Sequence, residues 1–222
     1  ILAVATATGA SQSITFAAQP SNTTITIVGT KQDYLRYVGS INVISEPHLT
    51  ITEVAVNDGG DAQLEYGEQA TFDITIKNIG DQASAPATAT LSTRTPEFVT
   101  ITNATASIPA LSPNQSTDLS EVFGISVADN VPNDSHLQFT LTITAGSHHW
   151  ENDFSFTAFA PVLRISDLYV INDNDRGNGN GRLDPGEDVQ ITLNFSNVGN
   201  AEVNNVTATL GSLVTQYITI QQ

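Results

Sequence analysis

The chain has 222 residues, with 23 acidic against 7 basic side chains, a formal net charge of −16, and neither Cys nor Met. The missing Cys excludes disulfides, thiolate metal sites and cysteine nucleophiles, and the acidic balance disfavours nucleic acid, whose phosphates it would repel. No apolar run approaches the roughly 20 residues that a membrane-spanning helix needs, so no membrane span is expected.

Apolar and polar residues alternate with period two along the chain, and no window has a sustained helical period. Clear examples are residues 24–28 (TITIV), 71–76 (TFDITI), 139–144 (FTLTIT) and 189–195 (VQITLNF). Such strands place apolar side chains on one face and Thr on the other. Turn signals such as NDGG at 57–60 separate them. The pattern predicts an all-β fold of tandem immunoglobulin-like antiparallel β-sandwiches.

The expected core of these sandwiches follows from the same alternation. It comprises Leu49, Ile51, Phe72, Ile74, Ile76, Phe139, Leu141, Ile143 and Phe154. The aromatic residues Trp150, Phe154 and Phe156 could instead suggest a sugar-binding platform. The same-face spacing of Phe154 and Phe156 favours a place in the core.

An internal repeat organises the chain. Residues 64–103 align with 183–222 without a gap at an offset of 119, and 49–51 align with 163–165 at an offset of 114. The second copy therefore carries five extra residues in its first loop. Matched positions are Phe72, Ile74 and Ile76 with Ile191, Leu193 and Phe195, and Asn78-Ile79-Gly80 with Asn197-Val198-Gly199.

The repeat predicts three domains. Residues 1–46 would be the closing part of one sandwich, 47–161 a complete sandwich, and 162–222 the opening part of a second repeat. Pro47 and Pro161 mark the junctions, because proline fixes φ and suits short, stiff linkers. Since residue 1 is not a Met, we expect a processed piece of a longer parent chain.

The loop at 172–187 (NDNDRGNGNGRLDPGE) is the candidate metal site. Calcium takes six to eight oxygen ligands, and glycines allow the positive-φ turns that bring alternate residues together. The expected ligands of one calcium ion are Asp173, Asp175, Asn178, Asn180, Asp184 and Glu187. The alternative is a hydrophilic turn in which Asn and Gly serve only the backbone conformation. The first-copy loop, with Asp58, Asp61, Glu65 and Glu68, lacks the dense Asn-Gly segment.

The sequence contains no motif that is typical of a catalytic site. His148 and His149 are neighbours, and adjacent strand residues point to opposite faces, so a hairpin turn is favoured over a shared metal. No G-x-S-x-G nucleophile motif, P-loop or dinucleotide fingerprint occurs. We therefore expect no enzyme activity and no cofactor other than calcium.

The repeat opening at 163–210 (LRISDLYVINDNDRGNGNGRLDPGEDVQITLNFSNVGNAEVNNVTATL) resembles bacterial Ig-like, cell-adhesion-related β-sandwich modules. Such modules lie C-terminal to secreted gingipain-like cysteine peptidases of the C25 family. Residues 24–45 (TITIVGTKQDYLRYVGSINVIS) resemble the end of the Ig-like domain that follows the catalytic domain there. The resemblance implies a region outside the catalytic domain, whose Cys and His this chain does not carry.

Two functions agree with these observations. The first is a structural accessory region of a secreted or cell-surface bacterial protein, in which stacked sandwiches space or orient the rest of the parent chain. The alternative is adhesion, in which the modules bind a host surface protein or a glycan, or associate with one another through open strand edges. The sequence favours no particular binding partner, because such folds bind through loops.

Overall fold

A computed structural model describes residues 1–6 and 13–220, without the side chains of residues 167 and 168. Residues 7–12 and 221–222, which belong to the expected first and third domains, lie outside the described residues. Among the described residues there is no helix, hence none with the length and apolar character that crossing a bilayer requires. The all-β prediction is confirmed.

Thirteen strands occur in the described residues. They are β1 (Thr23–Gly29), β2 (Tyr37–Val43), β3 (Leu49–Asn57), β4 (Leu64–Glu65), β5 (Gln69–Asn78), β6 (Ala87–Thr93), β7 (Val99–Asn103), β8 (Thr105–Ile108), β9 (Ser116–Val127), β10 (Ser135–Ala145), β11 (His148–Phe159), β12 (Leu163–Arg176) and β13 (Asp188–Asn197).

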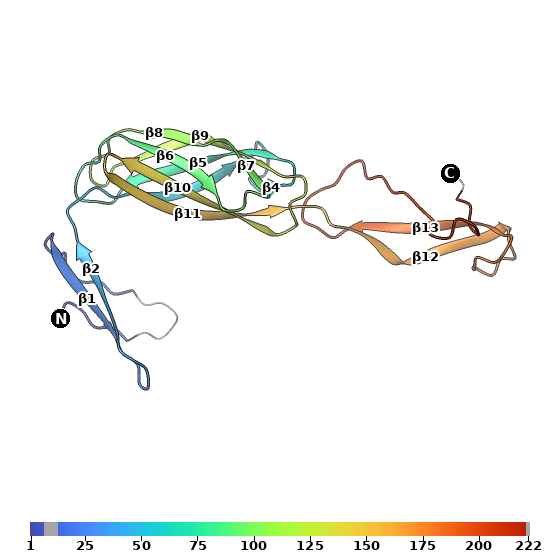
Figure 1. Cartoon of the computed structure of the whole chain (residues 1–222), viewed down its shortest axis with the longest axis horizontal. Coiled ribbons are helices and arrows are strands. Elements are labelled where there is room, and N and C mark those ends of the chain that lie inside the picture. Colours follow the sequence, from blue (N-terminus) through green and yellow to red (C-terminus); the bar gives the residue numbers. More distant parts are fainter. Residues whose placement is uncertain (7–12, 221–222) are drawn as a thin grey trace.

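The strands from β3 to β11 form one sandwich of two sheets (Figure 1). One sheet has the order β3-β5-β9-β7 and the other β4-β11-β10-β6-β8. All pairs are antiparallel except β4 with β11, which run parallel. Residues 146 and 147 form the turn between β10 and β11, and His148 and His149 begin β11, as the hairpin interpretation expected.

The facing sides of the two sheets make the core. Of the expected core residues, Leu49, Phe72, Ile74, Ile76, Phe139, Leu141 and Ile143 are buried, and Ile51 and Phe154 are partly buried against them. Four phenylalanine rings meet at the centre: the Phe72 centroid lies 5.0 Å from Phe139, 5.5 Å from Phe154 and 5.4 Å from Phe156. Trp150 also packs against this cluster, so the aromatic residues belong to the core.

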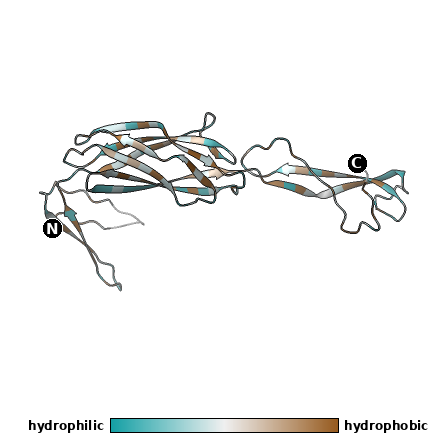
Figure 2. Cartoon of the chain, turned by 45° about the horizontal axis from the view of Figure 1, so that its top comes forward, coloured by the Kyte–Doolittle hydropathy of each residue, from teal (hydrophilic) through white to brown (hydrophobic). Residues whose placement is uncertain are grey.

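A two-stranded hairpin lies at each end of the sandwich (Figure 1). β1 pairs with β2 before the sandwich, and β12 pairs with β13 after it. Figure 2 shows apolar bands on both hairpins, outside the sandwich. Large apolar side chains are exposed there, including Val38 and Ile41 on β2 and Ile165 and Tyr169 on β12.

The second repeat copy departs from the first after β13. Residues 198–220 contain no strand, although the matching stretch of the first copy forms β6 and β7. In the complete sandwich β6 lies between β10 and β8, and β7 pairs with β9. A strand needs such partners for its N–H and C=O groups. The segment that follows β13 has none of them beside it.

Candidate functional site

The candidate calcium loop joins β12 to β13 at the tip of their hairpin, on the side away from the sandwich (Figure 1). Asp173 is its most buried polar residue, with 2% of its surface exposed. Its Oδ2 accepts the N–H of Asn180 at 2.9 Å and its Oδ1 accepts the N–H of Gly181 at 3.2 Å. Strand β12 thus places the Asp173 carboxylate inside the loop, whose backbone N–H groups surround it.

Glu187 closes the other end of the loop. Its Oε1 accepts the N–H of Asn178 at 2.9 Å, and its Oε2 accepts the N–H of Asp184 at 3.1 Å. The Asp184 carboxylate in turn accepts the side-chain amides of Asn180 at 2.7 Å and Asn178 at 3.0 Å. These hydrogen bonds, with the nearby charge of Arg182, hold the pKa of Asp184 below its ordinary value.

Glycine is required where the loop passes closest to its carboxylates. A Cβ on Gly177 would lie 2.6 Å from the carbonyl oxygen of Asp173 and 3.1 Å from the carboxyl carbon of Glu187. Gly179 and Gly181 both have a φ of +74°, which side chains disfavour. The Asn-Gly run therefore serves the backbone as well as any ligand.

The structure brings five of the six expected ligands together. Asp175 is exposed, and its side chain forms no hydrogen bond or ion pair with any described residue. The pairing of β12 with β13 shifts register between Asn172 and Arg176, so the residues around Asp173 do not follow a regular strand alternation.

The five gathered side chains supply carboxylate and amide oxygens, which suit a hard cation. In the structure the amide N–H groups of two asparagines point at Asp184, so a cation would need those amides turned oxygen-first. No group of three or more His, Cys, Asp or Glu side chains placed to hold a metal is found in the described part of the chain. Calcium binding here remains a prediction.

The matching loop of the first copy keeps one element of this framework. The N–H of Glu65 donates to Glu68 Oε2 at 2.9 Å, as Asp184 does to Glu187. Burial raises the pKa of Glu65 first, and the negative charges of Asp61, Glu202 and Asp58 raise it further. Burial likewise raises the pKa of Glu68.

A second feature of interest is the junction ahead of the sandwich. The Oδ1 of Asn78 accepts the N–H of His48 and the N–H of Gly80, each at 3.0 Å. Its Nδ2 donates to the carbonyl of Gln82 at 2.7 Å. Gly80 lies so close to the linker that an added Cβ would meet the carbonyl oxygen of Glu46 and lie 2.6 Å from the His48 nitrogen.

The junction behind the sandwich repeats this arrangement. The Oδ1 of Asn197 accepts the N–H of Val162 and the N–H of Gly199, each at 3.0 Å, and its Nδ2 donates to the carbonyl of Ala201 at 2.7 Å. A Cβ on Gly199 would meet the carbonyl oxygen of Ala160 and lie 2.5 Å from the Val162 nitrogen.

The middle residue of each motif adds one more bond to the linker. The N–H of Ile79 donates to the carbonyl of His48, and the N–H of Val198 donates to the carbonyl of Val162, both at 2.8 Å. We call Asn78-Ile79-Gly80 and Asn197-Val198-Gly199 the junction clamps. The repeat alignment contains both motifs, but their bonds to the linkers were not expected from the sequence.

Side chains of the sandwich reinforce the second junction. The Oδ1 of Asn133 accepts the N–H of Ala160 at 3.1 Å and that of Asn200 at 3.2 Å, and the Nδ2 of Asn200 donates to Asp134 at 2.8 Å. The Tyr66 hydroxyl donates to the carbonyl of Glu202 at 3.2 Å. The turn before β10 therefore holds both the linker and the following segment.

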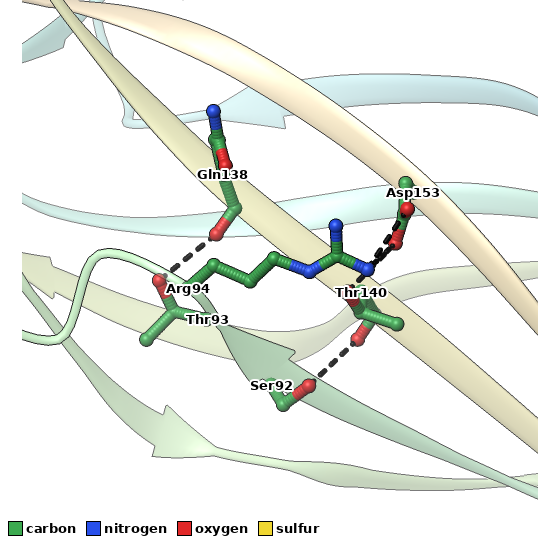
Figure 3. A network of polar contacts seen from close by, with 6 residues as sticks. All are labelled: Ser92, Thr93, Arg94, Gln138, Thr140 and Asp153. Carbon is green, nitrogen blue, oxygen red and sulfur yellow. Dashed lines mark hydrogen bonds and ion pairs between the residues drawn. The ribbon is translucent and has the colours of Figure 1, made fainter.

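A depression of the described surface lies over β10 and β11. It measures about 300 Å³ and is lined by Arg94, Gln138, Phe139, Asp153, Phe154 and Ser155. Arg94 Nη2 contacts both oxygens of Asp153 at 2.8 and 2.9 Å, and Thr140 donates to the same carboxylate at 2.7 Å (Figure 3). Arg94, which follows β6, and Asp153 on β11 neutralise each other across β10, the strand between them.

Comparison with known proteins bears on the fold. No protein-family model matches the chain, and no curated protein matches its sequence. Among solved structures, native alpha-2-macroglobulin from Escherichia coli, from domain MG7 to the C-terminus, is 10% identical with a TM-score of 0.41. The match covers 58% of this chain and 19% of that one, so this chain spans less than a fifth of its length.

Two smaller structures are also similar. The CARDB domain of a Pyrococcus furiosus protein, solved in complex with di-metal ions, is 12% identical with a TM-score of 0.31, over 50% of this chain and 88% of that one. A conjugative transposon lipoprotein from Bacteroides eggerthii is 17% identical with a TM-score of 0.27, over 49% and 93%. At such identities the likeness concerns the fold alone. None of these three is a gingipain-like peptidase, and the chain is an all-β protein with Ig-like macroglobulin and CARDB domains as structural neighbours.

Proposed function

We propose that this chain is a non-catalytic accessory region that spaces and orients other parts of a secreted or cell-surface bacterial protein. The observation that carries the proposal is the pair of junction clamps. Both use the same residue types, and the three side-chain bonds of each clamp have the same lengths at the two junctions. Each asparagine fixes the residue at which its linker enters the following unit, His48 or Val162, and so leaves that end of the linker little freedom to bend.

Clamped linkers are what a spacer requires. A free linker would let neighbouring domains sample many orientations, which is the ordinary case when the interface is small and polar. Each clamp makes two hydrogen bonds to the linker residue, to the N–H and to the carbonyl of His48 or of Val162. Asn133 and Tyr66 add bonds from the sandwich at the second junction, and together these bonds restrict the orientation. The modules would then act as a stiff arm.

The experiment measures the distance between one site on the sandwich and one on β13, whose spread reports how far their relative orientation varies. Because the chain has no Cys, spin labels can be placed at Ser155→Cys and Asn194→Cys alone. Electron–electron double resonance should give a narrow distance distribution for the otherwise unchanged chain and a broad one for Asn197→Ala. Gln190→Ala, an exposed change on β13, is the matched control and should leave the distribution narrow. A broad distribution before any clamp is removed would overturn the proposal.

The parent protein belongs to the proposal as well. The resemblance of residues 24–45 and 163–210 to modules behind C25 peptidases supports a gingipain-like parent whose catalytic groups lie in another domain. Binding of a host protein or a glycan has no specific observation in its favour, since Arg94 and Asp153, which line the depression over β10 and β11, neutralise each other.

We further propose that the loop at 172–187 binds one calcium ion and stiffens the hairpin that carries it. The buried Asp173 carboxylate, together with Glu187 and Asp184, supports this, since each faces the same short loop. Asn178 and Asn180 would add amide oxygens, and Asp175 would join only if its strand turned. Calcium supplies charge that offsets the repulsion among these carboxylates.

Calcium binding should shift the backbone amide resonances of Asn180 and Gly181, whose N–H groups donate to Asp173. It should also protect the hairpin from thermal unfolding. A ligand at a hundred times its dissociation constant stabilises by about 2.7 kcal/mol. Asp173→Asn should abolish both effects, whereas Asp61→Asn in the first-copy loop should preserve them. Identical spectra in calcium and in chelator would show that this loop does not bind the ion.

A further inference from the structure

The two repeat copies contain equivalent strand pairs, β3–β5 and β12–β13, whose apolar side chains are buried in the first copy and exposed in the second. In the sandwich, the side chains of Phe72 and Ile76 on β5 are 0% exposed. The matching residues on β13 are Ile191 and Phe195, which are 39% and 46% exposed. The apolar face that the sequence builds on β12–β13 is therefore open in this structure.

The complete sandwich shows what covers such a face. The Phe72 ring packs against rings of Phe139 on β10 and of Phe154 and Phe156 on β11. These two strands form one antiparallel hairpin in the opposite sheet. A hairpin with the apolar face of β10–β11 would cover β12–β13 in the same way.

The chain contains such a hairpin at its other end. β1 and β2 pair antiparallel along their whole length, and Ile27 and Ile41, which the register places on one face, are about half exposed. The turn before β1 resembles the one before β10: Asn22 has a φ of 61° and Asp134 a φ of 62°, each two residues after a proline. Each hairpin is also followed by a linker that contains a proline and then by a unit that carries a junction clamp.

The two open faces are therefore complementary halves of one sandwich. In Figure 1 they lie at opposite ends of the central sandwich, so they do not meet within one chain. We propose that the β1–β2 hairpin of one copy packs on the β12–β13 face of a second copy. This goes beyond the spacer function, because it concerns contacts between chains rather than orientation within one.

The symmetry of such a contact follows from its two different surfaces. A head-to-tail contact leaves one free hairpin at each end of a pair, so association continues into rings or filaments rather than stopping at a two-fold dimer. The net charge of −16 opposes it, so added salt should strengthen the association.

Two variants test the contact in a way that separates it from misfolding. The first variant carries Ile27→Asp and Ile41→Asp on the β1–β2 hairpin, and the second carries Ile191→Asp and Phe195→Asp on β13. The unchanged chain should show a mass that rises with concentration in size exclusion with light scattering. Each variant alone should stay at the 23.5 kDa of one chain.

Mixing the two variants is the decisive measurement. Each retains the surface that the other lacks, so an equimolar mixture should form a species of twice the chain mass and no larger one. Leu213→Asp, at an exposed residue outside both hairpins, is the control and should associate like the unchanged chain. A strictly monomeric unchanged chain, association by either variant alone, or a mixture that stays monomeric would each overturn the proposal. A monomer that binds no apolar dye would further show that the faces are covered within one chain.

Discussion

At the scale of single residues, the junctions depend on an asparagine and a glycine with different tasks. Asn78 is fully buried, and its side chain spends every donor and acceptor it has, including a second amide bond to the carbonyl of Leu111 at 2.9 Å. Gly80 contributes only the absence of a side chain, because the linker backbone occupies the space where a Cβ would stand. Neither task is visible from residue type alone.

Gly80→Ala should destabilise the sandwich by about 1–3 kcal/mol, the usual cost of forcing an extra methyl group into a packed site. The obstacle is backbone at Glu46 and His48, which cannot swing aside as a side chain can. Gly60→Ala is the matched control, since its Cβ would meet Asp58 only at an ordinary 3.6 Å. Thermal melting compares the two, and equal midpoints would contradict the close approach.

The acidic first-copy loop makes a prediction about pH. The pKa of Glu65 is raised by burial and then by the neighbouring charges, so the folded state binds its proton more tightly than the unfolded chain does. This contribution favours folding below the ordinary glutamate pKa of 4.5 and is lost as pH rises through the folded value.

Glu65→Gln should therefore raise the melting temperature at neutral pH and have little effect well below pH 4.5. The difference between variant and unchanged chain isolates this group from the other carboxylates that titrate in the same range. Melting curves at a series of pH values measure it. A gain that is the same at every pH would mean that packing, and not charge, is responsible.

At the scale of strands, an isoleucine on the apolar face of a strand has a different weight in the two repeat copies. Ile74 on β5 is 1% exposed and Ile191 on β13 is 39% exposed. Ile74→Ala should cost about 2–5 kcal/mol, because it leaves a cavity between two packed sheets. Ile191→Ala should cost less than about 1 kcal/mol, since exposed positions lose little burial. Urea unfolding at a dilute, monomeric concentration gives both values.

Strands were the part of the fold that the sequence predicted well, and the reason is period-two alternation. Residues 71–76 and 139–144 each carry a full apolar face, and both are in the core. The alignment also matched residues 88–91 of β6 to 207–210, which form no strand. Alternation indicates that a segment suits a sheet, but its partners decide whether it joins one.

The candidate site was predicted in outline for a related reason. Asn-Gly spacing indicated a tight loop around carboxylates, and Asp173 and Glu187 do hold that loop through backbone N–H groups. Asp175 stayed outside because the register shift in β12 breaks the alternation on which its inclusion relied. The junction clamps were missed because their bonds go to backbone atoms some 30 residues away in the chain, for example 30 between His48 and Asn78.

At the scale of the whole molecule, charge should control solubility. The chain carries a net charge of −16 at neutral pH and has an isoelectric point near 4.2. Self-repulsion weakens association between such chains, and the exposed apolar faces of both hairpins should associate more strongly once it is lost. Light scattering should therefore rise steeply as pH falls towards 4.2 and reverse on return to neutral pH. Scattering that is flat across this range would show that net charge does not limit association between the chains.

The position of each junction clamp has a consequence for how such arrays are lengthened. A clamp belongs to the unit that follows the linker, and it holds that linker through backbone N–H and C=O groups rather than through any particular side chain. A unit copied elsewhere in a gene would thus bring the clamp of its own joint, and only the added bonds of the kind that Asn133 and Tyr66 make would depend on its new predecessor. An array built in this way can gain or lose units by duplication and deletion while every joint keeps its clamp, so its length changes by one unit at a time.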